Sequence, residues 1–169
     1  MNHSEIIKEL DKNKAVFLHL LKETGRQEYL WRPETGKWCL LEIVCHLYDE
    51  ECEDFRARLK HTLQTPDRAL SPIDPVGWVS SRKYMEQDYE KMLSSFLGER
   101  QKSVEWLHSL DDPQWNNTHH HPKLGLLSAS LFLANWLAHD LLHIRQIIKL
   151  KYAHLKHHSG IDLSYAGNW

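Results

Sequence analysis

Apolar side chains recur at intervals of three and four residues through four long segments of the chain, which is the period of an amphipathic α-helix. The first predicted helix covers residues 4–24, because Ser4 can cap its start and Gly25 can end it. The other three predicted helices cover residues 38–62, 81–110 and 128–155. This pattern predicts an all-α protein.

Helix breakers are concentrated between the second and third predicted helices. Residues 63–79 contain Pro66, Pro72, Pro75 and Gly77, a density that no helix interior tolerates, so we expect a long crossover there. Four long helices with one such connection predict a four-helix bundle, a fold in which facing helices commonly build metal sites. The length of 169 residues predicts a single domain over residues 1–169.

Composition excludes several classes of protein. The chain has 21 Lys and Arg against 23 Asp and Glu, a net charge of −2, so no basic field favours nucleic acid or an anionic membrane. No stretch approaches the ~20 apolar residues of a membrane helix, and the start lacks the apolar centre of a secretory signal. Three cysteines without a C-x-x-C spacing predict neither disulfides nor a zinc ribbon. We expect a cytoplasmic protein.

The 13 histidines include a pair with the spacing of metal ligands on a helix. His139 and His143 stand at i and i+4 in the last predicted helix, so both rings can reach one ion. Asn135 and Gln146 fall on the same helical stripe. This stripe therefore combines candidate ligands with polar side chains that can orient them.

A third histidine lies in the most apolar half of the second predicted helix. In residues 38–48, only Glu42 and His46 are ionisable apart from cysteines and a tyrosine, so this half of the helix is expected to be buried. A buried imidazole needs a partner, and His46 can either bond Glu42 or bind a metal ion. Three histidines would leave an open coordination position, as in catalytic rather than structural metal sites.

Two other groups of histidines have simpler interpretations. His154, His157 and His158 lie among lysines at the end of the last predicted helix, which indicates a solvated helix terminus. His119, His120 and His121 precede a proline in an irregular segment and are expected near the mouth of the site.

Three segments together resemble the DinB-like superfamily, which includes bacillithiol S-transferases and mycothiol-dependent maleylpyruvate isomerases. They are RPETGKWCLLEIVCHLYDEE at 32–51, HPKLG at 121–125 and HDLLHIRQ at 139–146. The resemblance implies a four-helix bundle of up-down-down-up topology, commonly a homodimer. It also implies a divalent metal ion held by His46, His139 and His143.

The acidic residues after His46 are candidates for proton transfer. The resemblance aligns Glu51 with the acidic neighbour of the site, but at ~100° per residue Glu50 and Glu53 fall on the His46 face instead. We therefore predict that Glu50 or Asp49 moves protons, while Glu51 pairs with Arg56 or another helix. Glu42, Asn135 and Gln146 are predicted to orient the metal ligands.

The resemblance implies transfer of a low-molecular-weight thiol to an electrophilic small-molecule substrate. Two alternatives remain open: a hydrolase that uses metal-activated water, and a non-catalytic metal-binding protein of the stress response. Three imidazoles favour zinc or nickel and also suit iron, manganese or copper.

Overall fold

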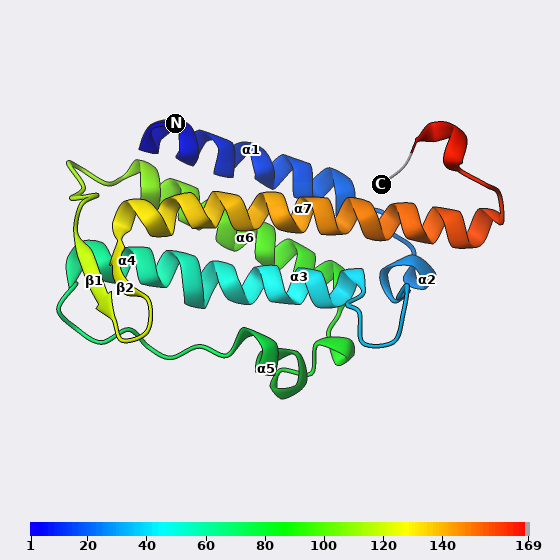
Figure 1. Cartoon of the computed structure of the whole chain (residues 1–169), viewed down its shortest axis with the longest axis horizontal. Coiled ribbons are helices and arrows are strands. Elements are labelled where there is room, and N and C mark those ends of the chain that lie inside the picture. The colour runs from blue at the N-terminus through cyan, green and yellow to red at the C-terminus, as the bar shows by residue number, and fades with distance from the viewer. Residues whose placement is uncertain (168–169) are drawn as a thin grey trace.

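The computed structural model describes residues 1–167, and its four long helices lie alongside one another (Figure 1). The first and last of them point one way and the middle two point the other way, which is the predicted up-down-down-up bundle. They are α1 (His3–Leu21), the continuous helix of α3 (Leu40–Asp49), η1 (Glu50–Phe55) and α4 (Arg56–Gln64), α6 (Tyr89–His108), and α7 (Ala129–Ser159).

Side-chain caps set the helix starts within a few residues of the predicted positions. Asn2, rather than Ser4, caps α1 through a reciprocal capping box with Glu5. Ser128 caps α7 by accepting from the backbone N–H of Leu131. The last helix runs on to Ser159, beyond the predicted end at 155, and stops at Gly160 in the left-handed region with φ of 63°.

The third long helix starts eight residues later than predicted, at Tyr89 instead of residue 81. Lys83 adopts a left-handed conformation with φ of 50°, which interrupts the helix, and Asp88 then caps α6. The crossover itself contains the short helices α5 (Pro75–Ser81) and η2 (Tyr84–Glu86) and returns along the bundle (Figure 1). The remaining short helices are α2 (Arg26–Tyr29) and η3 (Ser164–Ala166).

A two-stranded hairpin accompanies the helices of this mostly helical fold. Strands β1 (Thr118–His121) and β2 (Gly125–Ser128) pair antiparallel, with Thr118 opposite Ser128. Gly125 has φ of 76°, a turn conformation that glycine adopts at no steric cost. The hairpin lies at the end of the bundle where α4 ends and α7 begins (Figure 1).

The middle of the second long helix contains a π-helical segment, η1. A π segment holds one more residue per hydrogen-bonded turn than an α-helix, so residues after it are rotated relative to a regular helical wheel. π segments are rare and are frequently found at functional sites. A single helical wheel with 3.6 residues per turn therefore does not describe both halves of this helix.

A buried ionic network crosses the middle of the bundle, between two apolar clusters that fill its ends. The guanidinium of Arg100, only 1% exposed, donates to Glu51 at 3.0 and 2.8 Å and to Asp140 at 2.6 and 2.7 Å. Trp136 donates to Glu51, and Asn13 donates to Asp140. The network thus joins all four long helices. Burial alone would lower the pKa of Arg100, but its two carboxylate partners raise it, so the cation persists.

We expect Arg100→Met to lower the free energy of unfolding by about 3–5 kcal/mol, because it leaves two buried carboxylates without their cation. Urea denaturation measures this loss. Lys102→Met on the same helix is the matched control, since Lys102 pairs with Glu99 at the surface and its loss should leave the unfolding midpoint unchanged. Equal midpoints for Arg100→Met and the wild type would contradict this role of the network.

Candidate metal centre

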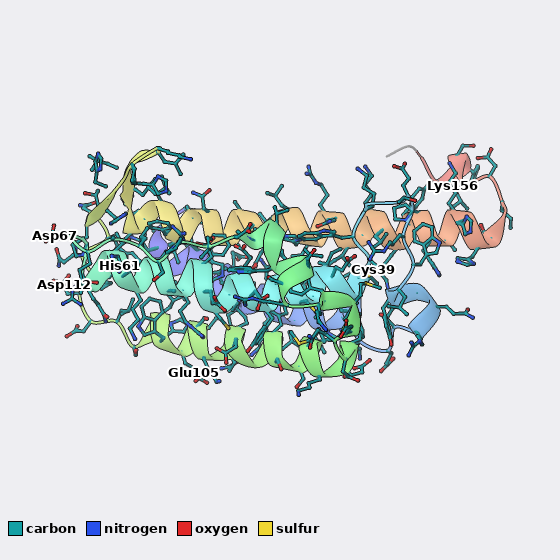
Figure 2. The ribbon with its side chains drawn as sticks, turned by 90° about the horizontal axis from the view of Figure 1, so that it is seen from below. Cys39, His61, Asp67, Glu105, Asp112 and Lys156 are labelled. Atoms are coloured by element: carbon teal, nitrogen blue, oxygen red, sulfur yellow. The ribbon has the colours of Figure 1, made fainter. Side chains whose placement is uncertain are left out.

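Three imidazoles from two helices converge on one point. His46 lies on α3, and His139 and His143 lie one turn apart on α7. The Nε2 atom of His139 is 3.3 Å from that of His46 and 3.0 Å from that of His143. In Figure 2, Cys39 and His61 mark the two ends of the helix whose first half carries His46.

This spacing fits a divalent cation. An ion about 2.0–2.1 Å from each nitrogen sets neighbouring ligand nitrogens ~2.9 to ~3.4 Å apart, for octahedral to tetrahedral angles. The Nδ1 atoms of His46 and His143 are buried without a hydrogen-bond partner. Protons on all three Nε2 atoms would collide, and with the protons on Nδ1 the three Nε2 lone pairs face one another. A cation among these lone pairs removes their repulsion, so the donor set suits a metal.

Burial keeps these imidazoles neutral, which is the form that binds metal. Burial, followed by the nearby His143, lowers the pKa of His46 to about 3. Burial, followed by His143 and His46, lowers the pKa of His139 to about 2. Burial lowers the pKa of His143 to about 4, although the neighbouring Gln146 acts in the opposite direction. The rings thus stay available as ligands even in mildly acidic solution.

Aromatic rings wall the centre on two sides. The ring of Trp38 packs on His46 and the ring of Phe55 packs on His139, each with centroids 4.9 Å apart. Phe55 also stacks on Trp136. These contacts restrict the rotation of the two imidazoles and hold them in position to bind.

The residues predicted to orient the ligands have different roles in the structure. Gln146 lies beside His143, and its role in orienting that ring stays a prediction. Glu42 does not bond His46, because its carboxylate accepts from the backbone of Cys39 and from Arg32, each at 2.9 Å. Asn135 donates to the carbonyl of Leu131 one turn earlier and lines a cavity beside His139. The prediction that Glu42 bonds His46 is therefore wrong, whereas the role of Asn135 in orienting the ligands stays a prediction.

The acidic residues after His46 separate into structural and candidate proton-transfer groups. Asp49 is held by Arg82 and by the hydroxyl of Tyr84, both at 2.6 Å, and its role as a proton carrier stays a prediction. Glu51 pairs with Arg100, so its predicted pairing with another helix is confirmed, while Arg56 pairs with Glu99 instead. Glu50 is buried, and burial followed by the charge of Asp54 raises its pKa to about 8.

The π segment explains why the helical wheel misplaces Glu53. Beyond Glu50 the extra residue turns Glu53 to the surface, where it pairs with Arg82. Asp54 takes the inward position instead and contacts both Glu50 and Arg58. Sequence analysis missed Asp54 and Arg58, and no local signal in the sequence distinguishes a π turn from an α turn.

A cavity of about 430 Å³ opens beside the cluster. His139 and Phe55 form its inner wall, and Asp54 and Arg58 contribute its charged groups. Its apolar walls come from the hairpin and the first half of α7 (Leu124, Leu127, Leu131, Phe132, Ala138 and Leu142). His121 also lines it, whereas His119 is turned away and its ring bonds the carbonyl of Pro66. The centre is thus open to a small molecule on the His139 side.

The sequence profile of the DinB superfamily matches residues 9–147. The chain belongs to the DinB superfamily. This match includes all three histidines of the cluster and most of the bundle. No curated protein gives a significant match to the sequence.

Two solved structures share the fold of this DinB-superfamily chain. YfiT from Bacillus subtilis, described as a probable metal-dependent hydrolase with an unusual four-helix bundle topology, has 19% identity and a TM-score of 0.78. The similarity covers 95% of this chain and 89% of YfiT. TT2238, described as a four-helix bundle protein, has 17% identity and a TM-score of 0.57, over 88% of this chain and 99% of its own.

The DinB-superfamily chain therefore contains a three-histidine cluster with the geometry of a divalent metal site. Within residues 1–167, no further Cys, His, Asp or Glu joins that cluster, so the candidate site has three ligands of these residue types. No helix in the same range combines the length and the apolar character needed to cross a bilayer.

In the metal-free protein we expect stability to fall as the pH drops from about 6.5 to about 4. Each imidazole takes up its proton only on unfolding in this window, so each contributes up to about 1.4 kcal/mol of lost stability per pH unit. Glu50 acts in the opposite direction, because its raised pKa means that the folded state holds the extra proton.

The difference in the pH dependence of stability between the wild type and a histidine variant isolates the contribution of one imidazole. Urea denaturation with a chelator at pH 7, 6 and 5 should give a flatter pH dependence for His143→Gln than for the wild type, by close to one proton. His157→Gln, at an exposed position of the same helix, should retain the wild-type slope. Equal slopes for wild type and His143→Gln would show that His143 is not buried as a neutral base.

Proposed function

We propose that this chain is a metal-dependent hydrolase that cleaves an ester, an amide or a similar bond in a small molecule. The observation that carries the proposal is a cluster of three neutral imidazoles beside an open apolar cavity. Three-ligand sites leave positions for water and substrate, in contrast to the closed four-ligand sites of structural zinc. The description of YfiT as a probable metal-dependent hydrolase supports the same activity.

In this proposal His46, His139 and His143 hold a zinc or nickel ion through their Nε2 atoms. Such an ion lowers the pKa of water towards ~7 and polarises a carbonyl oxygen. The aromatic rings of Trp38 and Phe55 keep the imidazoles in place, and the leucines of the cavity offer an apolar surface to the substrate.

Glu50 is the proposed proton acceptor and donor. It follows His46 by one helical turn, is buried, and has a pKa raised to about 8 by burial and by Asp54. A carboxyl group with a pKa near neutrality exchanges protons readily in both directions, as general acid–base catalysis requires. Asp54, which pairs with Arg58, can accept a hydrogen bond from Glu50 and so fix the orientation of its carboxyl group.

Transfer of a low-molecular-weight thiol, the activity implied by the sequence resemblance, is the second candidate. It needs the same three histidines and an additional bound thiol. The chain supplies no reactive thiol of its own at the centre, since burial raises the pKa of both Cys45 and Cys52 to about 12.

The homodimer stays a prediction, and the exposed Leu141, Ile148 and Leu155 at seven-residue spacing on α7 provide a surface for it.

The first test combines metal content with ester hydrolysis. Elemental mass spectrometry on untagged protein should find about one ion per chain in the wild type and in His157→Ala, and none in His46→Ala or His143→Ala. Hydrolysis of a p-nitrophenyl ester should follow the metal, being lost with chelator and restored by zinc or nickel. A retained ion in both triad variants would overturn the site. Turnover of thiol and electrophile, but not of esters or amides, would make thiol transfer the function.

The second test addresses the proton-transfer residue. We expect Glu50→Gln to lower kcat by about 10²–10⁴ while the metal content stays at the wild-type value, because only proton transfer is removed. Glu53→Gln is the matched control from the same helical segment, and its surface position predicts an unchanged kcat. Equal rates for Glu50→Gln and Glu53→Gln would contradict the proposed role of Glu50.

A further inference from the structure

Three cavities follow one another along α7, and the first two of them are lined by histidines of the cluster. The apolar cavity of about 430 Å³ includes Leu131, Leu142 and His139. The next, of about 680 Å³, shares Leu142 and includes His143, Arg145 and Lys149. The third, of about 380 Å³, shares Lys149 and includes Lys37 and Trp38. The cluster therefore lies within a groove that continues on both sides of it.

The two sides of this groove differ in charge. On the His139 side, the charged side chains are Asp54 and Arg58, which pair with each other. On the His143 side, the charged side chains are Arg145, Lys149, Lys37 and Glu34, a balance of three cations to one anion. We refer to Arg145, Lys149 and Lys37 as the basic cluster.

The basic cluster has no carboxylate partner in the part of the chain that the structure describes. Among residues 1–167, none of its three cations forms an ion pair, and all three are exposed. Neighbouring cations do have carboxylate partners: Arg82 binds Asp49 and Glu53, and Lys151, two residues after Lys149, binds Glu28. Three cations that face two connected cavities without carboxylate partners raise the local concentration of an anionic ligand.

We infer that the substrate of this site is an amphipathic organic anion. Its carboxylate or phosphate group binds the basic cluster, its apolar part occupies the leucine-lined cavity, and its reacting bond lies at the three histidines between them. The inference rests on the proposed function for the position of the reacting bond, but the preference for an anion depends only on the groove. Trp38 and Gln146, which line the basic side, add an aromatic face and an amide to the same ligand site.

The test uses the full-length metal-free protein, so that a carboxylate cannot bind a metal ion instead. Isothermal titration calorimetry compares 4-phenylbutanoate with its neutral isostere 4-phenylbutanamide, and 4-phenylbutyl phosphate distinguishes the two anionic groups. We expect at least one anion to bind about tenfold tighter than the amide, as several partly screened charge pairs together supply. Added salt should weaken binding of the anion and leave the amide unchanged.

Substitutions in the basic cluster test whether its cations cause the preference for the anion. Arg145→Gln and Lys149→Gln should each reduce the preference for the anion and leave amide binding unchanged. Lys156→Gln is the matched control, because Lys156 lies near the far end of α7 and lines none of the three cavities (Figure 2). Equal affinity for both anions and the amide, or an unchanged preference in both cavity variants, would overturn the inference.

A matched pair of esters separates this inference from the proposed hydrolysis. The metal-loaded protein is assayed with monophenyl glutarate, which carries a free carboxylate, and with the neutral phenyl butanoate. Hydrolysis of both esters at equal kcat/KM would overturn the inference and leave the hydrolase intact. Preferential binding of the anions to the metal-free protein, without hydrolysis of either ester, would support the inference and overturn the hydrolase.

Discussion

The buried guanidinium of Arg100 is the contact on which the geometry of the rest of the bundle depends. It binds Glu51, the residue after Glu50, and Asp140, the residue after His139. The two helices that carry the three histidines are thus tied to one rigid, planar group with two bidentate contacts. Because either carboxylate would be costly to bury alone, the network resists sliding or rotation of α7 against α3. The convergence of three Nε2 atoms within a narrow range of distances follows from that constraint.

Much of the fold and the core of the candidate site could be predicted from the sequence, because both depend on helical periodicity. The spacing of His139 and His143 fixes their relative position on any regular helix, and the apolar surroundings of His46 indicate burial before a structure is known. Proline density likewise identifies the crossover. These features are local, so a single sequence contains them.

Features that depend on contacts between distant residues could not be predicted in the same way. Glu42 bonds Arg32 and a backbone N–H instead of His46, a choice decided by how the preceding loop folds back. The third helix starts late because Lys83 adopts a left-handed turn, and the hairpin forms where only an irregular segment was expected. The helical wheel fails after Glu50 because it assumes 3.6 residues per turn throughout, whereas η1 has a longer repeat.

The π turn also rotates the two halves of one helix relative to each other about the helix axis. His46 and Glu50, up to the start of η1, follow the helical repeat of α3. Asp54 and Arg58, from the end of η1 onward, follow the helical repeat of α4. The extra residue rotates the second half of the helix about its axis relative to the first half. The two halves can therefore present side chains to different parts of the groove. When the sequence of this chain is aligned with that of a relative whose helix is regular, a one-residue gap belongs in the relative's sequence opposite residues 50–55. Without that gap, every position from Asp54 to Gln64 would be matched to the wrong face of the relative's helix.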